Sequence, residues 1–152
     1  MNKFRVEEIK AALKDDIVER FRTSIEDSDC GDFLNLIEIE KSDVNTEMYD
    51  IETSVQVYKN FLKWLFATFN EDEHSFRKSC LQRFGNLKSK KVLITSCGLG
   101  EDIAVVSKLV GSDGVIHAQD LSKNFVEVSS QNNISDNIFI NVSDALSLPY
   151  CD

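Results

Sequence analysis

The sequence predicts an α/β protein in which a mainly helical segment, residues 1–90, precedes a β-α-β-α-β unit, residues 91–152. Two patterns indicate this division. Before residue 90, apolar residues recur every three or four positions, which is the spacing of one face of a helix. After residue 90, short apolar runs alternate with helical stretches and glycine-containing turns, which is typical of a parallel sheet with right-handed crossovers.

The composition is that of a globular protein, with 42% apolar and 28% charged residues in a chain of 152 residues, which is enough for one domain. The net charge of −9 disfavours nucleic acid as a partner. No apolar run approaches the roughly 20 residues that a membrane span needs, and the first residues lack the apolar core of a signal peptide. The four cysteines have no C-x-x-C spacing, so we expect no metal site and a cytoplasmic protein with free thiols.

The helical segment is expected to hold three helices. The first carries an apolar residue at every fourth position: Ile9, Leu13, Ile17, Phe21 and Ile25. The second begins with Ser54 as its cap and carries a broad apolar stripe. We expect the aromatic residues of this stripe to lie in the core: Tyr58, Phe61, Trp64, Phe66 and Phe69. The third helix spans residues 73–84 and stops at Gly85, and between the first two helices we expect a short strand at 36–40 and a polar loop at 42–50.

In the second segment, strands are expected at residues 92–95, 115–119 and 138–142, with the first strand between the other two. One helix spans 102–110 and ends at Gly111, and another follows a cap at Ser122 and extends to about residue 131. His117 lies inside an apolar strand, so it is expected to be a packed residue and not a base. His74, beside three acidic residues, is expected to be a solvated residue at a helix start.

Polar or glycine residues follow each of the three strands. Gly98 and Gly100 come after the first strand, where glycine allows unusual dihedral angles and a close approach of the backbone to a ligand. Asp120, twenty residues after Gly100, ends the second strand and is placed to accept hydrogen bonds from ribose hydroxyls. Asp144 follows the third strand. Because parallel strands end at one edge of a sheet, these residues predict a site for a nucleotide-type cofactor.

These stretches resemble the motifs of class I S-adenosylmethionine-dependent methyltransferases, particularly the small-molecule type-11 branch. Residues 92–100, VLITSCGLG, resemble the family's glycine motif V-L-D-x-G-C-G-T-G. Residues 118–122, AQDLS, resemble its V-D-x-S motif, and residues 143–150, SDALSLPY, resemble G-D-A-x-x-L-P-F. The resemblance covers about 60 residues, and it implies the front half of a Rossmann-like methyltransferase sheet.

The resemblance also implies the cofactor, S-adenosylmethionine, and the residues that bind it: Thr95, Ser96, Cys97, Gly98, Gly100, Asp120, Leu121, Ser122, Asp144 and Ala145. The loop backbone would hold the methionine part, Asp120 the ribose hydroxyls, and Leu121 and Asp144 the adenine. The chain departs from the motif at two positions. Ile94 occupies the place of an acid that helps anchor the cofactor's amino group, and Ser96 replaces the first glycine. Glu101 or Asp102 is a candidate for the missing charge.

The resemblance therefore implies a methyltransferase that acts on a small-molecule acceptor. The sequence does not allow a catalytic residue to be assigned. Two alternatives stay open. A degenerate or truncated relative would act as a non-catalytic binding module. An NAD-dependent oxidoreductase fragment is less favoured, because its fingerprint needs glycine or alanine where Ile103 stands. We expect a chain that lacks the rest of its domain, turns over inefficiently by itself and self-associates through exposed strand edges.

Overall fold

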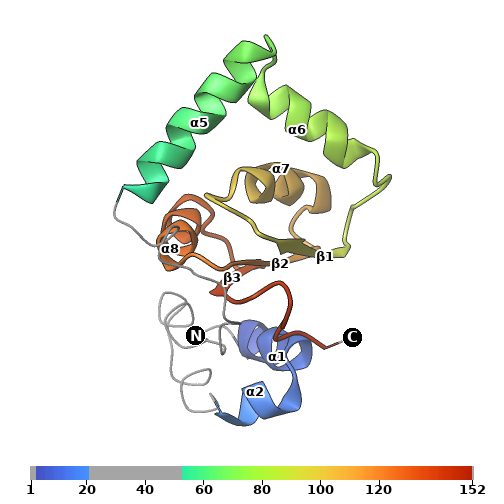
Figure 1. The fold of residues 1–152 in the computed structure, drawn as a ribbon. Coiled ribbons are helices and arrows are strands. Elements are labelled where there is room, and N and C mark those ends of the chain that lie inside the picture. Colours follow the sequence, from blue (N-terminus) through green and yellow to red (C-terminus); the bar gives the residue numbers. More distant parts are fainter. Residues whose placement is uncertain (1–2, 21–52, 152) are drawn as a thin grey trace.

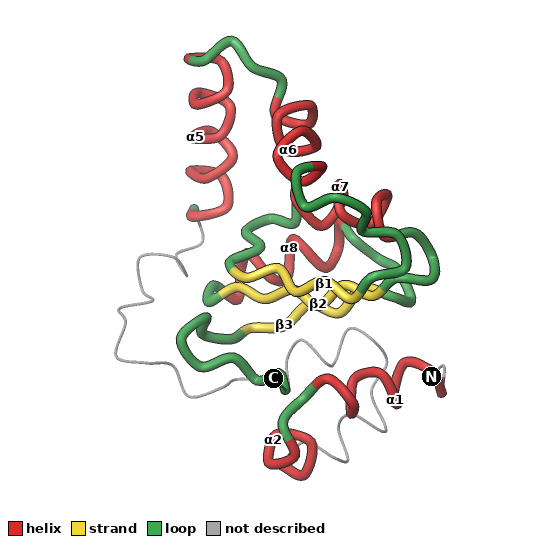
Figure 2. Tube along the Cα trace, turned by 90° about the vertical axis from the view of Figure 1, so that its right-hand side faces the viewer, coloured by secondary structure: helices red, strands yellow, loops and turns green. Residues whose placement is uncertain are grey.

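The computed structural model describes residues 3–20 and 53–151, and the expected strand at 36–40 and loop at 42–50 lie outside this part of the chain. The fold is α/β, with three layers (Figures 1 and 2). A parallel sheet forms the middle layer. Helices α7 (Glu101–Val110) and α8 (Lys123–Asn132) lie on one side, and α1 (Lys3–Ala12) and α2 (Asp15–Arg20) lie on the other.

The sheet contains β1 (Lys91–Thr95), β2 (Val115–Asp120) and β3 (Ile138–Val142), in the order β1-β2-β3. The expectation that the first strand is central is wrong, because β2 holds that place. Both crossover helices pack on the same face of the sheet, so each right-handed crossover moves the chain one strand further in the same direction. The two edge strands differ in burial: β3 is buried throughout, like residues 115–119 of the central strand, whereas β1 alternates between exposed and half-buried residues.

The two faces of the sheet differ in polarity, because successive side chains of a strand point to opposite sides. The face toward α7 and α8 is apolar and contributes Ile116, Ala118, Ile138, Ile140 and Val142 to the core. The other face carries the buried residues His117, Gln119 and Asn141. The carboxyl-terminal segment covers part of it, because the Asn141 side-chain amide donates a 2.7 Å hydrogen bond to the Tyr150 hydroxyl.

The first expected helix is broken into α1 and α2 at Leu13. Leu13 forms an isolated antiparallel bridge with Tyr150, and the Lys14 amide donates to the Pro149 carbonyl at 2.8 Å. This pairing takes backbone groups that a continuous helix would use, and Phe21 and Ile25 of the expected helix lie outside the described residues.

Helix α5 (Ser54–Thr68) begins at Ser54, so the prediction that Ser54 is the cap is wrong: the cap position belongs to Thr53. Helix α6 (Glu73–Gln82) is capped by Asp72, which accepts a hydrogen bond from the Ser75 amide, and it ends two residues before the predicted end. None of the helices within residues 3–20 and 53–151 combines the length and the apolar character that crossing a membrane requires.

The expectation that the aromatic stripe of α5 is core is wrong for three residues. Phe61, Trp64 and Phe69 are 48%, 61% and 69% exposed. Helix α5 leans away from the sheet and packs on α8, so only one side of it is covered (Figure 1). Tyr58 is on the covered side, with its ring 5.2 Å from that of Phe125, and Phe66 packs against Phe76.

Candidate functional site

The loop between β1 and α7 turns sharply at the carboxyl end of β1. Three of its residues have positive φ angles: 53° at Ser96, 57° at Gly98 and 89° at Gly100. Glycine adopts this region easily, whereas a residue with a side chain rarely does. The serine that replaces the first glycine of the motif therefore takes a left-handed conformation that favours glycine.

Asp120 holds this loop from the end of β2. Its carboxylate accepts hydrogen bonds from the Gly98 amide at 2.9 Å and from the Ser122 amide at 3.0 Å. A carboxylate offers about four acceptor positions, so these two bonds leave further positions for a ligand's hydroxyl groups. Asp120 is half-buried, and it lies where the glycine loop and the start of α8 meet.

Side chains pack closely against the two glycines. A Cβ atom at Gly100 would lie 2.5 Å from the buried Ser129 hydroxyl and against the Asn133 side-chain amide. A Cβ atom at Gly98 would lie 3.2 Å from the hydroxyl oxygen of Tyr58, which comes from α5. The loop is therefore supported by α8 below Gly100 and covered by α5 at Gly98.

Asp144 lies at the end of β3 beside the same edge. The Ser143 amide donates to the Asp120 carbonyl at 3.0 Å, which ties the segment after β3 to the end of β2. The Asp144 carboxylate accepts from the Leu146 amide at 2.8 Å, and this bond orders the turn at Ala145. Asp144 is buried and Ala145 is exposed.

The remaining predicted site residues differ in position. Ser122 is buried and caps α8 by accepting from the Phe125 amide, as predicted. Leu121 is half-buried and Thr95 is exposed. Cys97 is buried, and burial raises the pKa of its thiol to about 12, so it stays protonated and is a poor nucleophile. His117 is packed against Phe139, with ring centroids 5.0 Å apart, and burial lowers its pKa.

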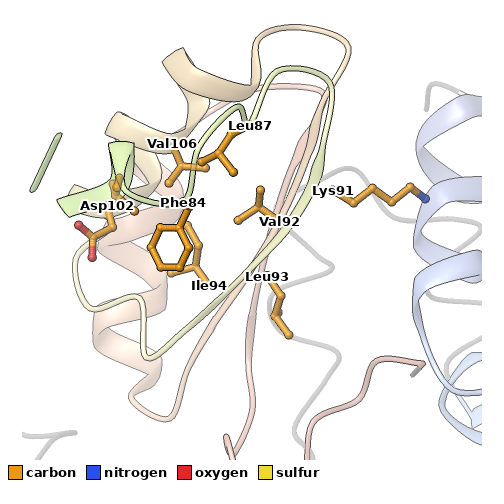
Figure 3. A pocket seen from close by; sticks show the side chains of 9 residues that line it. Phe84, Leu87, Lys91, Val92, Leu93, Ile94, Asp102 and Val106 are labelled. Carbon is orange, nitrogen blue, oxygen red and sulfur yellow. The ribbon is translucent and has the colours of Figure 1, made fainter. Parts of the chain in front are cut away.

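Ile94 packs against the apolar core instead of presenting a charge. It lines a cavity of about 430 Å³ beside β1, together with other mostly apolar residues (Figure 3): Leu81, Phe84, Leu87, Lys91, Val92, Leu93, Asp102 and Val106. Asp102 is the acidic member of this lining. Its carboxylate accepts a 2.9 Å hydrogen bond from the Arg77 guanidinium.

A group of charged residues lies between α6 and the start of α7. Arg77 pairs with Glu73 at 2.8 Å as well as with Asp102. Burial alone would lower the pKa of Arg77, but the hydrogen bonds to these two acids outweigh it and raise the pKa. Burial raises the pKa of the Glu101 carboxyl and that of Tyr58, and the Glu101 charge raises the Tyr58 pKa further.

The sequence did not point to Tyr58 and Arg77 as site residues. Tyr58 was expected in the core because it belongs to an apolar stripe, and Arg77 lies 25 residues before its partner Asp102. No local spacing links either residue to the glycine loop. Within the described part of the chain, no three residues among the histidines, cysteines and acids form a group that could hold a metal ion.

Comparisons with known proteins relate this arrangement to methyltransferases. No family model matches the chain. Over 83 residues the chain is 34% identical to a demethylmenaquinone methyltransferase of Staphylococcus aureus strain MRSA252, and 32% identical to that of strain JH9. Each match covers 54% of this chain and 34% of the relative, so the chain spans about a third of the length of these relatives.

Two solved structures have a similar fold. One is described as a putative S-adenosyl-L-methionine-dependent methyltransferase from Methanococcus maripaludis: TM-score 0.50, 23% identity, covering 73% of this chain and 48% of that one. The other is phosphoethanolamine N-methyltransferase 2 of Haemonchus contortus, in complex with S-adenosylhomocysteine: TM-score 0.50, 18% identity, covering 79% of this chain and 25% of that one. The chain therefore has the α/β fold of class I S-adenosylmethionine-dependent methyltransferases, and the 83-residue match relates it to them by sequence.

Proposed function

We propose that this chain binds S-adenosylmethionine at the carboxyl ends of β1, β2 and β3, as part of a methyltransferase that acts on a small molecule. The observation that carries the proposal is the junction of the glycine loop with Asp120, where a half-buried carboxylate bonds the Gly98 amide at 2.9 Å. This junction places a hydroxyl-binding acid at the end of β2 beside the glycine loop, where the Tyr58 side chain lies against Gly98.

The residues present fit most of this cofactor. Asp120 would hold the ribose hydroxyls with its remaining acceptor positions, and the turn ordered by Asp144 would face the adenine. The backbone between Ser96 and Gly100 would lie along the methionine part, where a Cβ atom at Gly98 would meet Tyr58. The bound cofactor supplies an electrophilic methyl group, and the task of these residues is to orient it and to exclude water.

A small-molecule acceptor is supported by the names of the related proteins, which include demethylmenaquinone and phosphoethanolamine methyltransferases. Neither Cys97 nor His117 is proposed as the base, because Cys97 stays protonated and His117 is buried on the polar face of the sheet under the carboxyl-terminal segment. The acceptor and the residue that takes its proton are therefore not assigned.

A second candidate is a relative that binds a ligand or partner without catalysis. The position of Ile94 favours it, because an apolar side chain beside an apolar cavity replaces the acid of the family motif. An NAD-dependent fragment is disfavoured, because Ile103 is completely buried at the position where that fingerprint needs a small residue.

Isothermal titration calorimetry tests the proposal, with S-adenosylhomocysteine and NAD⁺ titrated separately into the chain. We expect binding of S-adenosylhomocysteine only. Asp120→Ala should weaken it by roughly tenfold or more, because charge-assisted hydrogen bonds are lost. Asp113→Ala, at an exposed turn, is the matched control and should bind normally.

Preference for NAD⁺, or unchanged affinity in a folded Asp120→Ala chain, would refute the proposed site. Transfer of a labelled methyl group to quinol or aminoalcohol acceptors then separates the two candidates. Binding without transfer to any acceptor, by this chain or a longer version, would favour the non-catalytic relative.

A further inference from the structure

We propose that the apolar cavity beside β1 is a second binding site, for a small amphipathic anion. The apolar body of this ligand would lie in the cavity, and its anionic group would be bound by the side chains of Lys88 and Lys90. None of the residues proposed to bind the cofactor lines this cavity, so the inference does not depend on the proposed function.

The cavity suits the apolar body of a small ligand. Its volume is about 430 Å³, within the roughly 300–1,000 Å³ that is typical of ligand pockets. Figure 3 shows Phe84, Leu87 and Val106 gathered beside Val92 and Ile94. Phe84 remains 76% exposed although it lines the cavity, so the described part of the chain leaves apolar surface uncovered there.

The chain around this cavity is basic, although the whole protein is acidic. Residues 74–100 contain six lysine and arginine residues and no acid, in a chain whose net charge is −9. Such a local excess of one charge favours a ligand of the opposite charge. The six basic residues are Arg77, Lys78, Arg83, Lys88, Lys90 and Lys91.

Two of these six residues already have acidic partners. Arg77 is bonded to Glu73 and Asp102, and the ammonium group of Lys91 lies 2.7 Å from the carboxylate of Glu8. These charges are therefore compensated within the chain. Asp102 is the acid in the cavity lining, and its ion pair with Arg77 reduces the repulsion that an anionic ligand would meet there.

Lys88 and Lys90, in contrast, are exposed and form no ion pair with another residue of the described ranges. Each is next in the chain to a residue that lines the cavity, Leu87 or Lys91. Their Cα atoms therefore lie about 3.8 Å from those of lining residues. A lysine side chain is long and flexible, so both ammonium groups can reach a ligand at the cavity.

The backbone that carries the two lysines is fixed by hydrogen bonds. The Lys90 amide donates to the Leu87 carbonyl at 3.0 Å, and the Ser89 amide donates to the Val110 carbonyl, at the end of α7, at 2.9 Å. This turn lies at the amino end of β1, whereas Asp102 follows the loop at its carboxyl end. The anionic group would therefore bind at the turn, and the apolar body would extend along β1 toward Ile94.

The test compares two ligands that have the same chain length but differ in charge: octanoate and octan-1-ol. Both are titrated into the protein, and the methyl signals of leucine, isoleucine and valine are followed by NMR. We expect octanoate to bind roughly fivefold more tightly at low ionic strength, and high salt should reduce this preference. Both ligands should shift the methyl signals of Val92, Ile94 and Val106.

The double variant Lys88→Gln/Lys90→Gln should weaken octanoate to the affinity of octan-1-ol and leave octan-1-ol binding unchanged. The matched control is Lys59→Gln/Lys63→Gln, which removes the same charge from exposed positions of α5 and should keep the preference for octanoate. Phe84→Ser removes part of the apolar lining and should weaken both ligands equally.

Equal affinities of the unmodified chain for the two ligands, or an unchanged preference in Lys88→Gln/Lys90→Gln, would overturn the proposal. Binding to phosphatidylglycerol vesicles without binding of free octanoate would assign this surface to a membrane instead. Loss of octanoate binding at protein concentrations where sedimentation shows a dimer would assign the cavity to a second copy of the chain.

Discussion

Substituting Gly100 by alanine should destabilise the fold more than any substitution at an open glycine. Gly100 has a φ angle of 89°, and left-handed backbone costs a residue with a Cβ about 1–2 kcal/mol. The new Cβ would also lie 2.5 Å from the Ser129 hydroxyl and against the Asn133 side chain. Ser129 is completely buried, and overpacking of this kind costs about 1–3 kcal/mol. Together we expect a loss of about 2–5 kcal/mol in the free energy of unfolding.

Gly85→Ala is the matched control. Gly85 has a φ angle of 80°, but nothing lies within 4 Å of a Cβ atom placed there. Gly85→Ala should lower the free energy of unfolding only through the left-handed backbone. The difference between the two variants therefore measures the steric conflict of the Gly100→Ala side chain with α8. Urea unfolding monitored by circular dichroism gives both values. If Gly100→Ala lowers the free energy of unfolding no more than Gly85→Ala does, then Ser129 and Asn133 do not pack closely against the loop.

Three further predictions concern the cap of α8, the polar face of the sheet and its edge. Ser122→Ala removes the acceptor of the Phe125 amide and should cost about 1 kcal/mol in urea unfolding, whereas the exposed Ser112→Ala should cost little. Burial lowers the pKa of His117, so its protonation favours the unfolded chain. The free energy of unfolding should therefore fall as the pH drops below about 6.5, and His117→Phe should flatten this slope; an equally steep slope in the variant would contradict it. Leu93, 43% exposed on β1, should support association, so sedimentation should show the unmodified chain associating and Leu93→Lys remaining monomeric.

The second segment could be predicted well because its signals are local. The strand at 138–142 has the predicted bounds, and the two other strands are each one residue longer than predicted. The cap at Ser122 is confirmed because capping depends on a residue and its next three neighbours. The strand order was wrong because it depends on which face both crossover helices choose, and hydrophobic periodicity does not encode that choice.

The first segment was predicted less well because tertiary contacts decide its structure. The break at Leu13 arises from pairing with Tyr150, which lies 137 residues further along the chain. The apolar periodicity of α5 predicts the helix correctly, but it does not predict which of its residues are buried. Burial depends on how much of the helix surface the rest of the chain covers, and the periodic pattern contains no information on this. Phe61 and Trp64 are exposed for this reason, while Tyr58 on the same helix is covered.

Prediction of the candidate site depends both on local sequence motifs and on tertiary contacts. The motifs placed Gly98 and Asp120 close together, and the 2.9 Å bond between them confirms that proximity. The motifs could not show which acid near Ile94 is available for a ligand, because that depends on Arg77 from another helix. The division of the chain at residue 90 stays a prediction, although Lys91 of β1 pairs with Glu8 across it at 2.7 Å.

β1 is one of the two edge strands of the described sheet and also the strand that leads into the glycine loop, so this loop has an ordered strand on one side only. From that side it is held by the Asp120 carboxylate and by the Cys97 amide, which donates to the Gln119 carbonyl at 2.8 Å. The other contacts come from α5 through Tyr58 and from α6 through the Arg77 ion pair with the start of α7. Ligand affinity at the loop should therefore depend on how α5 and α6 pack against α7 and α8. The helical segment accordingly forms part of the candidate site, and the strands alone do not complete it.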